Sequence, residues 1–222
     1  MTSDGSKNSK QTTQLIEKLS LDLTPTASSH RVKVYLAKWL AVVSSVFVVS
    51  WFIYPKRADL ALKWFDSHFV AESALWFFIS LAAAGVVIKS AFPSQLRRQH
   101  LQFAYLPILS LATLLLSRIS LADLGGEWNG EMSLRRGWCG LIIVGSTVAI
   151  SALGMMWAKN QAPARMSLTG AWIAISAGAF SSFIIQFICA HESVMHITLW
   201  HVLPVVLLTS FAAYTAQKLL RW

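Results

Sequence analysis

The chain has 222 residues, of which 55% are hydrophobic and 13% charged, and its mean hydropathy of +0.53 excludes an ordinary water-soluble domain and is typical of a membrane protein. The net charge of +9 does not indicate nucleic-acid binding, because the Lys and Arg residues are spread between apolar runs and form no dense patch. We therefore expect contact with a lipid bilayer and no direct contact with nucleic acid.

The first 34 residues differ in texture from the rest of the chain. Residues 1–14 are rich in Ser, Thr, Lys and Gln and are predicted to be disordered. A short amphipathic helix ending at Pro25 should follow, because four apolar side chains share one helical face and charged ones the other. The apolar positions are Leu15, Ile16, Leu19 and Leu23, and the charged ones are Glu17, Lys18 and Asp22. So short a helix is marginal in water, so we expect it to bind a partner.

The remaining residues, 35–222, contain apolar runs of the length that crosses a bilayer, which takes about 20 helical residues. The predicted spans are Tyr35–Tyr54, Phe69–Phe92, Leu101–Leu121, Trp138–Ala158, Met166–Ala190 and Ile197–Leu220. Pro107 interrupts the third of them. The sequence therefore predicts an all-α polytopic membrane protein with six transmembrane helices, preceded by a separate cytoplasmic segment of residues 1–34.

The distribution of basic residues orients these helices. With the N-terminus in the cytoplasm, thirteen of the 19 Lys and Arg residues lie on the inner side, which favours two cytoplasmic termini. In this orientation Cys139 opens the fourth span and Cys189 closes the fifth, so both thiols reach the outer side at similar depth. A disulfide between them is permitted but not required, because packed helix axes lie slightly farther apart than a bridge spans.

Two kinds of chemistry are open to these cysteines, the only two in the chain. They can form a redox-sensing pair in a compartment that allows disulfides, or they can be small apolar packing residues. A metal site drawn from them and from His191, His196 and His201 is the second kind. His196 and His201 would point well apart on an α-helix, and interfacial histidines are usually solvated, so we expect no metal and no cofactor, with His191 and His196 as the remaining candidates.

Transport and catalysis find little support in the sequence. Coupled transporters carry ionisable groups near the middle of their spans, whereas Glu72, Lys89, Arg118 and His201 lie near span ends and the middles hold small residues. None of the common hydrolase, metalloprotease or phosphate-loop motifs is present. We therefore expect the protein not to be an enzyme.

Three stretches resemble the NrsF-like family of bacterial membrane proteins, the negative regulators of sigma F. They are LIEKLSLDLTP near the N-terminus, QAPARMSLTGAWIAISAGAFSSFIIQFICAHES, and TLWH with the terminal LLRW. The resemblance implies an anti-sigma factor of the bacterial inner membrane that sequesters an extracytoplasmic-function sigma factor. Carried over by position, it assigns sensing of oxidants or heavy metals on the periplasmic side to Cys139 and Cys189.

The resemblance also assigns sigma-factor binding to the N-terminal segment around Leu15, Ile16, Leu19 and Leu23. A helix laid in a partner's groove uses apolar anchors at such spacing. Two alternatives stay open at this point: a membrane thiol-disulfide oxidoreductase and a small-molecule transporter. The former would need a second, exchangeable thiol pair, and the chain has two cysteines in all.

Overall fold

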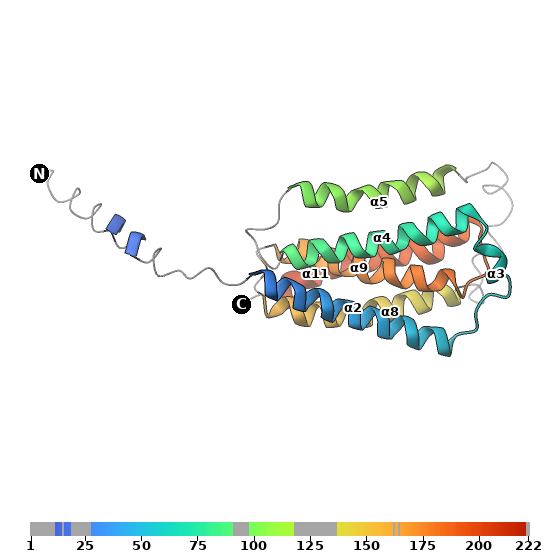
Figure 1. The fold of residues 1–222 in the computed structure, drawn as a ribbon, viewed down its shortest axis with the longest axis horizontal. Coiled ribbons are helices and arrows are strands. Elements are labelled where there is room, and N and C mark those ends of the chain that lie inside the picture. Colours follow the sequence, from blue (N-terminus) through green and yellow to red (C-terminus); the bar gives the residue numbers. More distant parts are fainter. Residues whose placement is uncertain are drawn as a thin grey trace, which may run out of the picture. The chain divides into compact units, whose positions relative to one another are not determined.

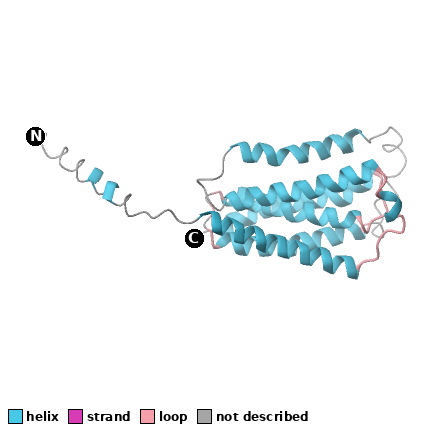
Figure 2. Cartoon of the chain, in the orientation of Figure 1, coloured by secondary structure: helices cyan, strands magenta, loops and turns pink. Residues whose placement is uncertain are grey.

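The computed structural model describes residues 12–14, 16–18, 28–90, 98–117, 137–161, 163 and 165–220. Over these residues the chain forms helices joined by short loops, and no strand (Figure 2). The predicted all-α class is therefore confirmed for the part of the chain that is described.

The chain divides into two units, Met1–Val34 and Tyr35–Trp222. In the smaller unit residues 12–14 and 16–18 are helical, and 62% of the Ile16 side chain is exposed. Leu15, Leu19 and Leu23 of the predicted amphipathic helix lie outside the described residues. The apolar face of that helix therefore stays a prediction.

The larger unit is a helical bundle in which successive long helices run in opposite directions (Figure 1). Its helix α2 begins in the smaller unit and enters the bundle at Tyr35. The long helices are α2 (Ser28–Ile53), α4 (Ser67–Ser90), α5 (Arg98–Ser117), α8 (Trp138–Lys159), α9 (Met166–Gln186) and α11 (Leu203–Leu219). The short elements are α3 (Leu60–Lys63), α10 (Val194–His196) and the π-helical segment η2 (Ile197–Val202).

Five helical stretches of the described chain are long and apolar enough to cross a membrane. They are Lys33–Ile53, Ser67–Ser90, Trp138–Lys159, Met166–Gln186 and Val194–Leu219. The predicted third span also forms a helix, α5, but its apolar part, Leu101–Ser117, is shorter than the about 20 residues that a bilayer core takes. The count of six spans and the orientation of the termini thus stay predictions.

Helix α9 is the centre of the bundle, with 78% of its most apolar window buried. Its small residues let neighbours come close, as is common where helices pack in membranes. Ser176 and Ser80 of α4 each donate a hydrogen bond to the other's backbone carbonyl, at 3.0 and 2.8 Å. A Cβ on Gly170 would lie 2.4 Å from the Cβ of Ala216, so only glycine allows α11 to pack there.

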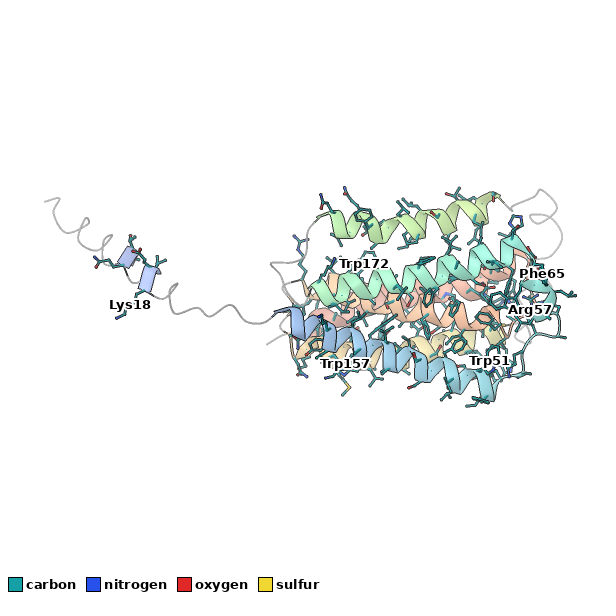
Figure 3. All side chains as sticks on the ribbon, viewed as in Figure 1. Lys18, Trp51, Arg57, Phe65, Trp157 and Trp172 are labelled. Carbon is teal, nitrogen blue, oxygen red and sulfur yellow. The ribbon has the colours of Figure 1, made fainter. Side chains whose placement is uncertain are left out.

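One end of the bundle gathers the loop after α2, the start of α8, the end of α9 and the segment Val194–Val202 (Figure 1). Figure 3 shows Trp51, Arg57 and Phe65 at this end and Trp157 toward the other end. We call it the Arg57 end. Helix α9 stops here at Gln186, whereas the predicted span continued to Ala190, because the carbonyl of Phe187 accepts a hydrogen bond from the backbone N–H of Arg57 at 3.1 Å.

A candidate metal-binding site of two cysteines and two histidines

Four side chains with metal-binding atoms meet at the Arg57 end: Cys139, Cys189, His196 and His201. Their ligand atoms, one Sγ or one ring nitrogen from each residue, all lie within 4.8 Å of one another. Cys189, His196 and His201 are buried and Cys139 is half-buried, and both cysteines are free thiols. The fold therefore unites residues from three separate elements in one enclosed cluster.

Cys139 reaches the cluster because two glycines let α8 approach the π-helical segment closely. A Cβ on Gly137 would lie 2.6 Å from the ring of Trp200, and a Cβ on Gly140 would lie 2.8 Å from the same ring. Real Cβ atoms do not come so near, so any larger residue at either position would push α8 away. The two glycines thus set the distance from Cys139 to the histidines.

The π-helical segment changes the angular relation of His196 and His201. Five residues along an α-helix correspond to about 140° around its axis, which is why the two side chains were expected to point apart. That expectation is wrong, because residues Ile197–Val202 form the wider π turn, with i to i+5 hydrogen bonds. Their rings lie 5.4 Å apart between centroids.

The local sequence accounts for this wider turn. Pro204 has no backbone N–H, so Trp200, four residues earlier, cannot receive the usual helical hydrogen bond from it. At the start of the segment, Ser193 caps the helix by accepting a hydrogen bond from the backbone N–H of His196 at 3.1 Å. The cap and the proline together hold His196 and His201 on one side of the turn.

Cys189 lies in the loop that follows α9, where Arg57 fixes its backbone. The Nη1 group of Arg57 donates a hydrogen bond to the carbonyl oxygen of Cys189 at 3.2 Å, and the Sγ atom of Cys189 lies 3.3 Å from Nε2 of His196. The pKa of the Cys189 thiol is lowered from its ordinary value, chiefly by the hydrogen bond with Cys139 and further by His196. A thiolate at Cys189 is the form that binds metal or attacks an oxidant.

Arg57 is itself held by an ion network, with only 1% of its side chain exposed. Its guanidinium donates to both carboxylate oxygens of Asp59, at 2.7 and 2.8 Å, and to Glu192 at 2.6 Å. Glu192 also accepts a hydrogen bond from Lys63 at 2.6 Å. The network thus ties the loop after α2 to the loop that carries Cys189.

The network predicts a dependence of stability on acid. The hydrogen bonds from Arg57 hold the pKa of Asp59 at about 2, below its ordinary value of 3.8. A lowered pKa contributes stability above the ordinary value, and this contribution is lost as the pH falls toward 2. We expect Asp59→Asn to melt below the wild type at pH 7 and level with it near pH 2, measured by circular dichroism in detergent. An equal deficit at both pH values would contradict the ion pair.

His191, one of the two predicted metal candidates, lies outside the four-residue cluster. Its ring contacts that of His196, with centroids 5.0 Å apart, but the residue is exposed. His201 takes the position that the sequence did not assign. The missed signals are the cap and the proline around the two histidines and the two glycines that flank Cys139.

The four side chains offer two sulfur and two imidazole ligands, the set that tetrahedral zinc sites use. The cluster holds no carboxylate from the described chain, so it does not suit Mg²⁺ or Ca²⁺, which bind oxygen. Two neighbouring thiols can also be oxidised to a disulfide. The arrangement is therefore fit for metal binding or for a thiol redox change.

The family comparison agrees with the resemblance seen in the sequence. The family model described as NrsF, negative regulator of sigma F, matches residues 19–222. No curated protein and no solved structure matches the chain. Since the match covers nearly the whole chain, this protein belongs to the NrsF family of negative regulators of sigma F.

Proposed function

We propose that the protein is an anti-sigma factor of the bacterial inner membrane that holds an extracytoplasmic-function sigma factor and releases it when Cys139 and Cys189 are modified. The observation that carries the sensing part is the close approach of these two thiols, which are 50 residues apart in sequence, in one enclosed cluster. Membership of the NrsF family carries the sigma-factor part.

The proposed topology has six spans and two cytoplasmic termini. In the bundle, the Tyr35 end of α2 and the Leu220 end of α11 lie opposite the Arg57 end (Figure 1). With the termini in the cytoplasm, the cysteines face the periplasm. Residues 1–34 then form the cytoplasmic segment that binds the sigma factor through Leu15, Ile16, Leu19 and Leu23.

The proposed redox step is the formation of a disulfide. Each thiol loses one proton and one electron, and a sulfur–sulfur bond forms between Cys139 and Cys189. A peroxide such as hydrogen peroxide accepts the two electrons and two protons, its oxygen–oxygen bond breaks, and two water molecules result. Because the sulfur atoms are no more than 4.8 Å apart and a disulfide is about 2 Å long, the bond needs a shift of the loop at Cys189.

This shift is the proposed origin of the signal. Cys189 is bonded to Arg57 through its carbonyl, and Arg57 follows α2, the helix that enters from the N-terminal segment. A change that favours one of two bundle arrangements by about 1–3 kcal/mol alters partner affinity about 5- to 150-fold. A closed, four-residue cluster without room for a substrate supports a regulator over an oxidoreductase.

Co-purification from membranes tests the proposal. The tagged full-length chain should retain a sigma factor under reducing conditions and lose most of it after hydrogen peroxide treatment. The Cys139→Ser variant should retain the sigma factor in both conditions. Met156→Leu is the matched control for sulfur oxidation, because Met156 is 64% exposed and distant from the cluster in sequence, and it should respond like the wild type.

Two outcomes would contradict the proposal in separable ways. If no sigma factor accompanies the reduced wild-type protein, the anti-sigma function fails. If Cys139→Ser releases the sigma factor as the wild type does, the assignment of sensing to the cysteines fails while the partner stands.

A further inference from the structure

His201 is buried without a hydrogen-bond partner. Only 1% of its surface is exposed, and within the described residues neither ring nitrogen donates or accepts a hydrogen bond. Burying a polar group unpaired is unfavourable, and the great majority of such groups in native proteins have partners. The orphaned ring, aimed into a cluster of two thiols and a second imidazole, therefore indicates a missing ligand.

The distances in the cluster fit a small cation. In a tetrahedral zinc site the sulfur and nitrogen ligands lie about 2.3 and 2.0 Å from the metal, so a sulfur and a nitrogen on one ion are separated by about 3.5 Å. The Sγ of Cys189 and the Nε2 of His196 are 3.3 Å apart. The largest separation among the four ligand atoms, 4.8 Å, needs only a small contraction to reach the same geometry.

The charge of the ligands also fits the buried location. Two thiolates and two neutral imidazoles carry two negative charges, which one divalent cation neutralises. The resulting site has no net charge, so little is lost on its burial, whereas two thiolates without a cation would be strongly disfavoured. Binding would release the two thiol protons.

We propose that Cys139, Cys189, His196 and His201 bind one Zn²⁺ ion in a closed tetrahedral site. The π turn supplies the two histidines, the glycines beside Trp200 bring in Cys139, and Arg57 positions Cys189. The ion enters from the side of Cys139, the half-buried member of the cluster.

The regulatory meaning of this site rests on the proposed function. The ion holds the thiolates apart as ligands, so the resting sensor is metal-bound and not a disulfide. A softer cation such as Cd²⁺ replaces Zn²⁺ at thiolate ligands, and an oxidant that joins the sulfurs expels the ion. Both events change the same four side chains, and one site then serves two kinds of stress.

Metal binding by the purified full-length chain in detergent, under reducing conditions, tests the inference. The wild type should bind about one Zn²⁺ per chain by elemental analysis and give the thiolate charge-transfer and d–d absorption bands of tetrahedral Co²⁺ when loaded with Co²⁺. His201→Gln should bind at least about 100-fold more weakly, since removal of a ligand exceeds the 10- to 100-fold cost of losing a ligand's supporting contact. The matched control is His191→Gln, at the exposed histidine beside the cluster, which should bind like the wild type.

A second variant guards against misfolding of the first. His201→Cys keeps a ligand at the position, so it should bind the metal and show a stronger thiolate-to-cobalt band. Unchanged Zn²⁺ affinity in His201→Gln, or no binding by the reduced wild type, would overturn the inference. If the wild type binds no Zn²⁺ yet still co-purifies with a sigma factor, the metal site fails and the anti-sigma function stands; Zn²⁺ binding without a sigma factor gives the reverse.

Discussion

A chain carrying Leu15→Asp together with Leu19→Asp should no longer repress its sigma factor, and transcription from the cognate promoters should be high without stress. Each leucine is a proposed apolar anchor, and burial of such a side chain contributes about 1.5–3 kcal/mol. Loss of both should therefore weaken binding by about 3 kcal/mol or more, which is at least about 100-fold. A promoter fusion in living cells measures the effect.

The control for this variant is Lys18→Asp, which lies on the predicted charged face of the same helix. It changes the net charge by the same two units as the double leucine substitution, so it separates the loss of apolar anchors from the change of charge. It should leave repression intact. Equal amounts of protein in the membrane, checked by immunoblot, are needed for both. Full repression by the double variant would disprove binding through this segment.

Arg57→Met should lower the melting temperature of the bundle and loosen the loop around Cys189. The substitution leaves the Asp59 and Glu192 carboxylates and the Cys189 carbonyl without their shared donor. Removal of one partner from a fully buried ion pair costs about 3–5 kcal/mol, and a cost nearer 2 kcal/mol is expected here because both carboxylates are partly exposed. For a chain of this size that corresponds to a shift of about 4–8 °C.

Two measurements check this result. Thermal unfolding in detergent gives the shift, and the rate at which a maleimide labels Cys189 in a Cys139→Ser background reports the loop, which should react faster. Lys56→Met makes the same chemical change at the neighbouring, exposed lysine, whose contact is with the ring of Trp51, and it should be near neutral. If Arg57→Met melts and labels like Lys56→Met, the network does not position the loop.

The helices are the part of the fold that the sequence predicted well. Within the described chain, α8 begins at the predicted residue and ends one residue later than expected, and α4 begins two residues before the predicted Phe69. Long apolar runs give this accuracy because a chain in a bilayer must satisfy its backbone hydrogen bonds internally. The end of α9 was missed because a contact from a distant residue, Arg57, stops it.

Arg57 illustrates a second limit of sequence reasoning. Counted only as one of the basic residues of an outer loop, it gave information about orientation. In the structure it is buried and binds two carboxylates and the backbone on each side of Ile188. No rule based on the local sequence connects residue 57 with residue 189, because the contact depends on how α2 and α9 pack.

The sequence by itself determined that this is a helical membrane protein of the NrsF family with two cysteines, because apolar length and family motifs are local properties of the chain. Only the tertiary structure decided that Cys139, Cys189, His196 and His201 share one site. The physical reasons are a π turn before Pro204, which alters the angle between two histidines, and two glycines that let Trp200 approach α8. Both act through packing between elements, which residue spacing along the chain does not report.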